Sequence, residues 1–214
     1  MSQVDFEIVA LQNVGELTIH PFNPAQLNPA SYNLRLSDSF CNARGQHLLP
    51  WSTSTERARK GNVGSIFTIH PGEFVLASTI EKIELSRRVA AEVKGRSSIG
   101  RLGIQVECAG WVDPGFGLAQ ITLEVKNISE EPVNLVVGMP ICQIVFFYLG
   151  SRAKNPYEGV YRHQSGATPS KYKELIGRIS SEKLQRWADH GEFPFTLDCL
   201  AVTLNEDGLE NVDD

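Results

Sequence analysis

Short runs of apolar and β-branched residues recur through the middle of the chain, each too short for a typical helix. Turn-forming groups such as His70-Pro71-Gly72 and Asp113-Pro114-Gly115 separate them, and no long amphipathic pattern lies between them. Parallel sheets need crossover helices, so the pattern favours antiparallel pairing and predicts a mainly β fold, closed as a barrel or jelly roll. The predicted strands are 66–69, 73–78, 82–85, 89–93, 104–107, 119–126, 133–137 and 141–149.

The two ends of the chain differ from this middle region. Prolines at positions 21, 24 and 29 predict loops leading into strands, with a half-buried strand at 31–36 and a surface loop at 52–64. Residues 150–170 are polar, whereas 171–190 carry apolar side chains at helical spacing before an acidic C-terminus that is expected to fray. We therefore expect one domain over 1–170 and a C-terminal helical extension over 171–214.

Composition narrows the class of protein. Hydrophobic residues make up 42% of the chain and charged residues 21%, which is typical of a globular protein. The net charge of -5 offers no electrostatic surface for nucleic acid or an anionic membrane, and no apolar run approaches the roughly 20 residues of a membrane span. Four distant cysteines without a CxxC pair indicate a reduced, cytoplasmic protein.

The first candidate site is the segment GRSSIGRLG at 95–103, which combines three glycines, two serines and two arginines. Glycines let backbone amides approach an anion, and arginine pairs with phosphate oxygens through two parallel hydrogen bonds. The segment matches neither the P-loop nor the dinucleotide-binding motif. It is either a phosphate-binding loop between strands or a basic surface turn.

The second candidate site combines a turn with the strand that follows it. Asp113 lies in the turn AGWVDPGF, where Trp111 is expected to be a core residue, and the strand continues as ITLEVKN. Alternation along a strand places Glu124 on the polar face, beside Thr122 and between the apolar positions Leu123 and Val125. Glu124 is either a general base in a partly dry site or an ordinary solvated glutamate.

Several motifs in a fixed order resemble the dCTP deaminase family, a branch of the trimeric dUTPase-like fold. They are NPASYNLRLSD, GRSSIGRLG, AGWVDPGF, ITLEVKN and PYEGVYRHQSGATPS, and together they span about residues 21–170. The resemblance implies hydrolytic removal of the 4-amino group of dCTP without zinc. It also implies a homotrimer whose nucleotide sites are shared between subunits, with dUTP and dTTP as further possible ligands.

The resemblance also implies roles for individual residues. Glu124 would be the general base and acid, Ser97 would help to position the attacking water, and Arg101 would orient the glutamate. Asp113 would contact the deoxyribose 3′-hydroxyl, and Mg²⁺ would bind the phosphates rather than protein side chains. The remaining nucleotide-binding positions implied are Arg96, Ser98, Ile99, Gly100, Thr122, Leu123, Gln143, Tyr157 and Gln164, the last two in a C-terminal segment that closes over the nucleotide.

Members of the family either release dUTP or continue to dUMP and diphosphate. The motif AGWVD and Gln143 resemble the dUMP-forming branch. Two other functions stay open, namely a dUTP diphosphatase without deaminase activity and a nucleotide-binding regulatory protein that has lost turnover. A zinc deaminase is disfavoured because His190-Gly191-Glu192 is not followed by a PCxxC motif.

Three departures from the family pattern bear on the site. Asn33 replaces a usual aspartate, and Val160 replaces a lysine of the closing segment, for which Arg162 or Lys171 could substitute. Asp113 and Glu124 are eleven positions apart instead of ten. Because a one-residue shift would turn Glu124 to the wrong face, we expect the extra residue to be absorbed in the bend at 116–119, as a bulge.

Overall fold

The computed structural model describes residues 2–43, 56–60, 64–106 and 109–171. The chain divides into two units, one formed by 1–48 and 54–169 and the other by 49–53 and 170–214. Of the second unit only Ser170 and Lys171 are described, so the predicted helical extension lies almost entirely outside the described residues.

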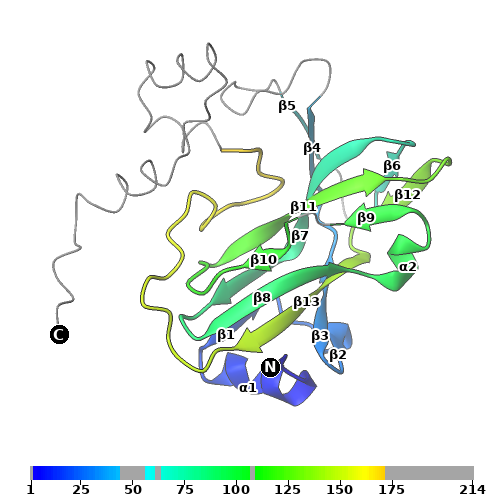
Figure 1. Ribbon diagram of the computed structural model, residues 1–214. Coiled ribbons are helices and arrows are strands. Elements are labelled where there is room, and N and C mark those ends of the chain that lie inside the picture. Colours follow the sequence, from blue (N-terminus) through cyan, green and yellow to red (C-terminus); the bar gives the residue numbers. More distant parts are fainter. Residues whose placement is uncertain (1, 44–55, 61–63, 107–108, 172–214) are drawn as a thin grey trace, which may run out of the picture. The chain divides into compact units, whose positions relative to one another are not determined.

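The first unit is built mainly of strands (Figure 1). The helices are α1 (Asp5–Asn13), the 3-10 helix η1 (Pro24–Gln26) and α2 (Ser97–Gly100). The strands are β1 (Leu17–His20), β2 (Leu27–Asn28), β3 (Ser31–Arg35), β4 (Ser39–Ala43), β5 (Glu56–Lys60), β6 (Ile66–Ile69), β7 (Phe74–Leu85), β8 (Val89–Gly95), β9 (Ile104–Val106), β10 (Trp111–Val112), β11 (Ala119–Asn127), β12 (Val133–Val136) and β13 (Pro140–Tyr148).

All strand pairs within the described residues are antiparallel, which confirms the predicted fold class. One sheet has the order β5-β4-β7-β11-β9, with β1 also paired to β7. The second sheet has the order β10-β8-β13-β3-β2, and β12 pairs with β6 in a small third sheet. The surface loop predicted at 52–64 is wrong in part, because residues 56–60 form β5 and pair with β4.

The core is one contiguous cluster supplied by both large sheets. Leu123 and Val125 of β11 are fully buried, as are Ile144 and Phe146 of β13. Burying a side chain of this size contributes about 1.5–3 kcal/mol, so the strands with the strictest apolar alternation hold the sheets together. On the opposite face β11 carries polar side chains, whereas β13 carries Gln143, Val145 and Phe147.

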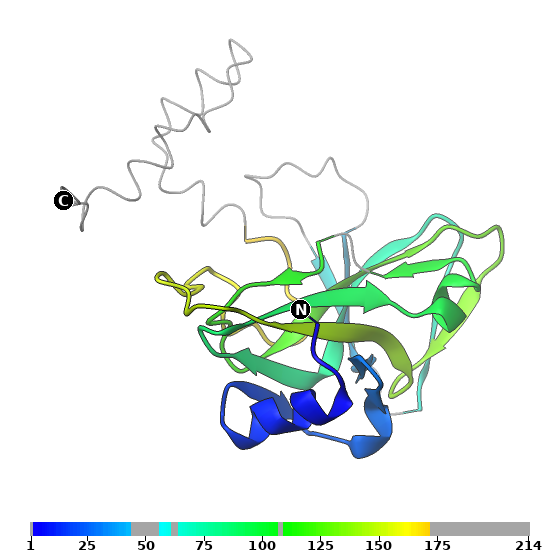
Figure 2. The same ribbon diagram turned by 60° about the horizontal axis from the view of Figure 1, so that its bottom comes forward.

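The N-terminal segment contains a helix that the sequence analysis missed. α1 begins after Val4, whose N–H donates to the Glu7 carboxylate at 2.9 Å, so that a side chain satisfies an amide at the helix start. Ile8 and Leu11 of α1 are buried, and the helix packs beside β1 (Figure 2). The prolines that disfavour helix begin only at Pro21, after this segment has ended.

β3 is more deeply buried than the predicted half-buried strand. Ser31 and Asn33, at the positions expected to be exposed, are only 7% and 8% exposed. Their side chains hydrogen-bond to Asn28, and the Ser31 hydroxyl donates to Gln143 at 2.9 Å. Asn33 therefore takes part in packing of the β2–β3 hairpin, because its amide pairs reciprocally with that of Asn28.

β7 is a single strand where two were predicted, and it carries an irregularity at the gap between them. Gln120 pairs with Lys82, whereas Thr122 pairs with Ser78, so two steps along β11 match four along β7. Two extra residues therefore lie on β7, with residues 79–81 opposite Ile121. This register shift adds its residues to β7 rather than to the segment between Asp113 and Glu124, so the bulge at 116–119 stays a prediction.

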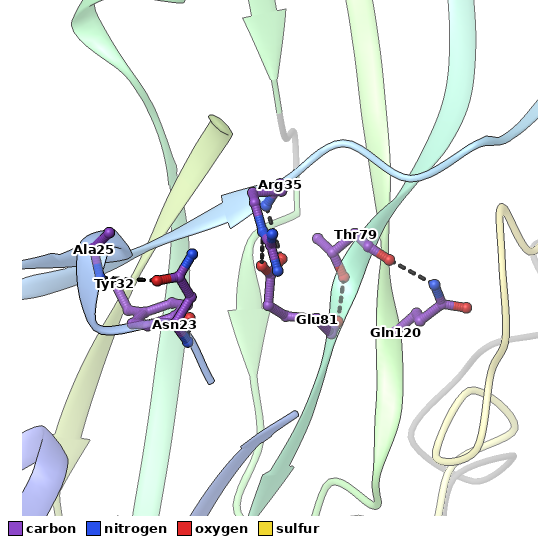
Figure 3. Close-up of polar contacts among 7 residues, drawn as sticks. All are labelled: Asn23, Ala25, Tyr32, Arg35, Thr79, Glu81 and Gln120. Carbon is purple, nitrogen blue, oxygen red and sulfur yellow. Dashed lines mark hydrogen bonds and ion pairs between the residues drawn. The ribbon is translucent and has the colours of Figure 1, made fainter. Parts of the chain in front are cut away.

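Side chains satisfy the polar groups that this bulge removes from the strand ladder (Figure 3). The Thr79 hydroxyl donates to the carbonyl of Glu81 at 2.7 Å and accepts the N–H of Ile121 at 3.0 Å. The Glu81 carboxylate is fully buried and accepts from both the backbone N–H and Nε of Arg35, at 2.7 and 2.6 Å. Because Arg35 belongs to β3, this ion pair connects the two large sheets at the bulge.

Candidate functional site

β11 presents one face to the core and the other to the candidate site. Its odd-numbered positions from Ala119 to Asn127 are buried, whereas Gln120, Thr122 and Glu124 are half-buried and Lys126 is exposed. The alternation is unbroken because the additional residues of the bulge lie on β7 rather than on β11. Glu124 therefore lies on the polar face with Thr122, as the alternation predicts, despite the longer spacing from Asp113.

The turn before β11 exposes Asp113. The indole Nε1 of Trp111 donates to the Asp113 carboxylate at 2.9 Å, and the indole ring stacks on Phe147 with centroids 5.9 Å apart. Trp111 is 56% exposed, so its prediction as a core residue is wrong. β10 is an edge strand of its sheet, which leaves one side of Trp111 without a neighbouring strand. The indole instead holds the orientation of Asp113.

The tail at 150–169 follows the turn and β11 of its own chain, as the yellow segment beside β10 and β11 in Figure 1 shows. Tyr157 N–H donates to the Pro114 carbonyl at 2.7 Å, and Arg162 Nε donates to the Gly115 carbonyl at 3.2 Å. Farther along, the Thr122 hydroxyl contacts the side-chain oxygen of Gln164 at 3.3 Å. The tail thus brings Tyr157 and Gln164 to the elements that carry Asp113 and Glu124.

The surroundings of Tyr157 shift the pKa of its phenol. Burial raises the pKa of Tyr157 above its ordinary value, and the nearby negative charge of Asp113 adds to the increase. The ring of Tyr157 also lies 6.1 Å from that of Phe116. The phenol is therefore neutral at physiological pH and can donate a hydrogen bond to an acceptor in the site.

The segment GRSSIGRLG contains a short helix rather than only a loop. β8 ends at Gly95, and α2 follows at once, anchored by Ile99, which is 4% exposed in the core. Ser97, Ser98, Gly100 and Arg101 are exposed, and Arg101 Nε donates to the Ser97 hydroxyl at 3.2 Å. The side chain of Ile99 is unavailable to a ligand, so this position could offer only its backbone.

Arg96 precedes α2 and contains a polar atom without a partner. Its Nη1 is buried and makes no hydrogen bond. A buried guanidinium nitrogen left unpaired carries a desolvation cost, which an anion bound beside it would offset. Lys94 is already paired with Glu92, whereas Arg96 and Arg101 supply positive charge beside α2. These groups fit a phosphate.

Gln143 lies beside this segment on β13. Its Nε2 donates to the Gly95 carbonyl at 3.2 Å, and its Oε1 accepts from the Ser31 hydroxyl. Gln143 is thus placed between β3 and β8, where it holds the residue that precedes Arg96. Its observed contacts are with the protein itself.

The contacts arrange the predicted residues in two clusters. Asp113, Thr122, Glu124, Tyr157 and Gln164 belong to the turn, β11 and the tail, with Leu123 buried behind them and contributing only backbone. Arg96, Ser97, Ser98, Ile99, Gly100, Arg101 and Gln143 form the second cluster around α2. Along β9, Ile104 pairs with Asn127, three positions beyond Glu124, so the register places α2 near the far end of β11.

Two polar residues near the first cluster, Ser39 and Gln120, were not predicted from the sequence. Gln120, Thr122 and Glu124 are alternate positions of one strand, so the alternation could have predicted that Gln120 lies on the same face as the other two. Ser39 meets the tail only through the fold and gave no such signal.

Two properties of the described residues bear on metals and membranes. No group of three or more His, Cys, Asp or Glu side chains gathers as a metal site in this part of the chain. None of the helices described is long and apolar enough to cross a membrane.

The fold is an antiparallel β protein in which the Glu124 carboxylate lies on the polar face of β11, next to the chain's own tail. A separate cationic segment around α2 is suited to binding phosphate. The dCTP deaminase-like family matches residues 3–149, and the chain belongs to this family. This confirms the resemblance seen in its motifs.

Individual relatives agree with the assignment to the family. The chain is 40% identical over 167 residues to a protein of Aquifex aeolicus named dCTP deaminase, dUMP-forming, covering 78% of this chain and 92% of the relative. It is 43% identical over 156 residues to a Hydrogenobaculum protein of the same name, and the match covers 73% of this chain and 87% of that relative. The crystal structure of 2'-deoxycytidine 5'-triphosphate deaminase from Agrobacterium tumefaciens has a similar fold, with a TM-score of 0.52 and 20% identity over 68% of this chain and 47% of that one.

Proposed function

We propose that this protein is a dCTP deaminase that hydrolyses dCTP to dUTP and ammonia. The observation that carries the proposal is the position of Glu124, half-buried on the polar face of β11 beside Thr122, in a chain of the dCTP deaminase-like family. Close relatives named as dCTP deaminases support the same substrate. As an enzyme acting on a soluble nucleotide pool, it would work in the cytoplasm.

Glu124 performs the proton transfers in this proposal. Its carboxylate takes a proton from a water molecule as the water oxygen bonds to C4 of cytosine, and gives this proton to the ring nitrogen. It then takes the second proton from the new C4 hydroxyl and gives it to the 4-amino group, so that the bond between C4 and this nitrogen breaks, ammonia leaves and the C4 carbonyl forms. The hydroxyl of Ser97 helps to hold the water, and Arg101 orients the carboxylate. The proposed chemistry assigns no step to zinc, because a positioned carboxylate replaces a metal-activated hydroxide.

The two clusters divide the nucleotide between them. Asp113 would accept a hydrogen bond from the 3′-hydroxyl, while Tyr157 and Gln164 close the base side and the backbone at Thr122 and Leu123 contacts the base. Arg96, Ser98 and the amides of Ile99 and Gly100 would bind the triphosphate, which the buried, unpaired Nη1 of Arg96 supports. Mg²⁺ bound to the phosphates would reduce their charge.

We also propose that the protein is a homotrimer in which α2 of one subunit completes the site of another. The two clusters on one chain support this arrangement, because α2 contacts β9, and β9 pairs with the part of β11 that lies beyond Glu124. Several apolar side chains at the α2 end are exposed, including Leu102, Phe74 and Ile128. Light scattering on the purified protein should give three times the chain mass of 23.7 kDa.

A second product is favoured by the names of the relatives. Because both relatives quoted are named as dUMP-forming, we propose that the enzyme continues from dUTP to dUMP and diphosphate. Incubation with dCTP and, separately, with dUTP distinguishes the possibilities by chromatography of the products. Product from dUTP alone would indicate a diphosphatase without deaminase activity, and nucleotide binding without product would indicate a regulatory protein.

The test of the main proposal is the Glu124→Gln variant. We expect it to lose ammonia release from dCTP by at least about a hundredfold, since general acid–base catalysis contributes roughly that much, and to keep nucleotide binding. Glu84→Gln, at an exposed position of β7, is the matched control and should retain activity. The proposal fails if Glu124→Gln deaminates dCTP at the wild-type rate, and a zinc chelator that abolishes the activity would refute the metal-independent chemistry.

A further inference from the structure

Gln120 lies between the bulge of β7 and the tail, on the face of β11 that carries Thr122 and Glu124. Its Nε2 donates to the Thr79 carbonyl at 2.6 Å, as Figure 3 shows. Its Oε1 accepts the N–H of Gly166 at 2.8 Å, with the Ser165 hydroxyl at 3.4 Å. The side chain therefore connects a buried irregularity of the sheet to a segment 46 residues away in the chain.

Only one orientation of the Gln120 amide satisfies both partners. The Thr79 carbonyl can only accept a hydrogen bond and the Gly166 N–H can only donate one, so the nitrogen must face the bulge and the oxygen must face the tail. The bulge thus dictates which end of the amide the tail meets. A side chain of similar length without this polarity would lose both contacts.

Two further hydroxyls bind the same stretch of tail. The Ser39 hydroxyl accepts the N–H of Ala167 at 3.0 Å, and the Thr122 hydroxyl accepts the N–H of Thr168 at 3.1 Å. Gly166 has a φ of +67°, and a Cβ at that position would lie 2.7 Å from the Ser39 oxygen. The close approach and the positive φ together require glycine there.

These contacts determine where Gln164 lies. Gln164 precedes the anchored Gly166 by two residues, and its side-chain oxygen contacts the Thr122 hydroxyl, two positions from Glu124 along β11. We propose that Gln120 is a positioning residue that latches the tail, so that Gln164 is held at the site before the nucleotide binds. This inference rests on the proposed function for its effect on catalysis, but the docking itself can be measured without substrate.

The first experiment measures the docking directly. Gln120→Met keeps the length of the side chain and removes both hydrogen bonds, and Gln105→Met changes an exposed glutamine on the neighbouring strand β9 as a control. Hydrogen–deuterium exchange of peptides covering 164–168 in the full chain should accelerate about tenfold in Gln120→Met and remain unchanged in Gln105→Met. Gly166→Ala, which perturbs the latch from the tail side, should give the same acceleration. Unchanged exchange in Gln120→Met overturns the latch.

The second experiment measures the consequence for catalysis. If the latch raises the fraction of chains with Gln164 in place, Gln120→Met should raise KM for dCTP about five- to tenfold with kcat changed less than about twofold. In a Gln164→Ala background the same substitution should add little, because the latch acts through Gln164. A residue that only filled the bulge would lower thermal stability and leave KM unchanged.

The outcomes separate the two proposals. Faster exchange with an unchanged KM, or the full effect on KM persisting in Gln164→Ala, overturns the positioning role. If the wild-type protein releases no ammonia from dCTP, the proposed function fails, and the exchange rates alone then decide whether Gln120 holds the tail.

Discussion

The ion pair between Arg35 and Glu81 should be among the most sensitive polar contacts for stability. The Glu81 side chain is fully buried, and it accepts two hydrogen bonds from Arg35, one from the backbone and one from the guanidinium. Glu81→Gln preserves the volume and one acceptor oxygen but removes the negative charge. The guanidinium, whose side chain is 22% exposed, is then left partly buried without a counter-charge.

The magnitude follows from the geometry. Two unit charges about 4 Å apart attract by about 4 kcal/mol at an effective dielectric constant of about 20. Partial exposure of Arg35 reduces this, because water solvates the guanidinium when the pair is broken, so we expect a loss of about 3 kcal/mol. For a chain of this length that corresponds to a decrease in Tm of about 6–12 °C.

The assay is urea unfolding followed by circular dichroism, with the free energy of unfolding compared between variants. Glu84→Gln, three residues along β7 and exposed, is the control and should change stability by less than about 0.5 kcal/mol. A loss below about 1 kcal/mol for Glu81→Gln would refute the reasoning. The double variant Arg35→Met, Glu81→Gln should recover part of the loss, since it leaves no buried charge unpaired and keeps an acceptor for the backbone N–H of residue 35.

Two further predictions concern Trp111 and Tyr32. Trp111→Phe keeps stacking on Phe147 but loses the N–H that orients Asp113 toward the 3′-hydroxyl. The preference for dCTP over 2′,3′-dideoxycytidine triphosphate, which lacks that hydroxyl, should therefore fall about fivefold in kcat/KM, a loss of about 1 kcal/mol, whereas Phe147→Leu should preserve it. An unchanged preference in Trp111→Phe would contradict this role. Burial raises the pKa of Tyr32 above its ordinary value of 10.0. The folded protein therefore holds the phenol proton more tightly than the unfolded chain does, and the resulting stabilisation is lost as the pH rises above about 10. In urea unfolding between pH 8 and 11, Tyr32→Phe should reduce the decline of the free energy of unfolding with rising pH. At pH 8 the substitution should cost about 1 kcal/mol, because the Asn23 N–H loses its acceptor. A decline as steep as in the wild type would contradict this prediction.

Strands with one apolar face could be predicted closely from the sequence. The strands predicted at 66–69 and 119–126 match β6 and β11 within one residue, because alternation along a strand is a local property. Features that depend on distant partners were not predicted. The exposure of Trp111 follows from the edge position of β10, and the burial of Ser31 and Asn33 follows from Asn28 and Gln143.

The sequence by itself determined the class of fold, the family and the face of β11 on which Glu124 lies, because all three depend on local alternation and on motifs of adjacent residues. Only the tertiary structure showed that β7 carries two additional residues opposite Ile121. Residues 79–81 of β7 are accommodated there because Thr79, Glu81 and Gln120 can satisfy the backbone groups and charges exposed at the bulge. The groups that contact Thr79 and Glu81 from outside β7, namely Arg35, Gln120 and Ile121, belong to strands far away in the chain, and nothing in the local pattern of β7 identifies them.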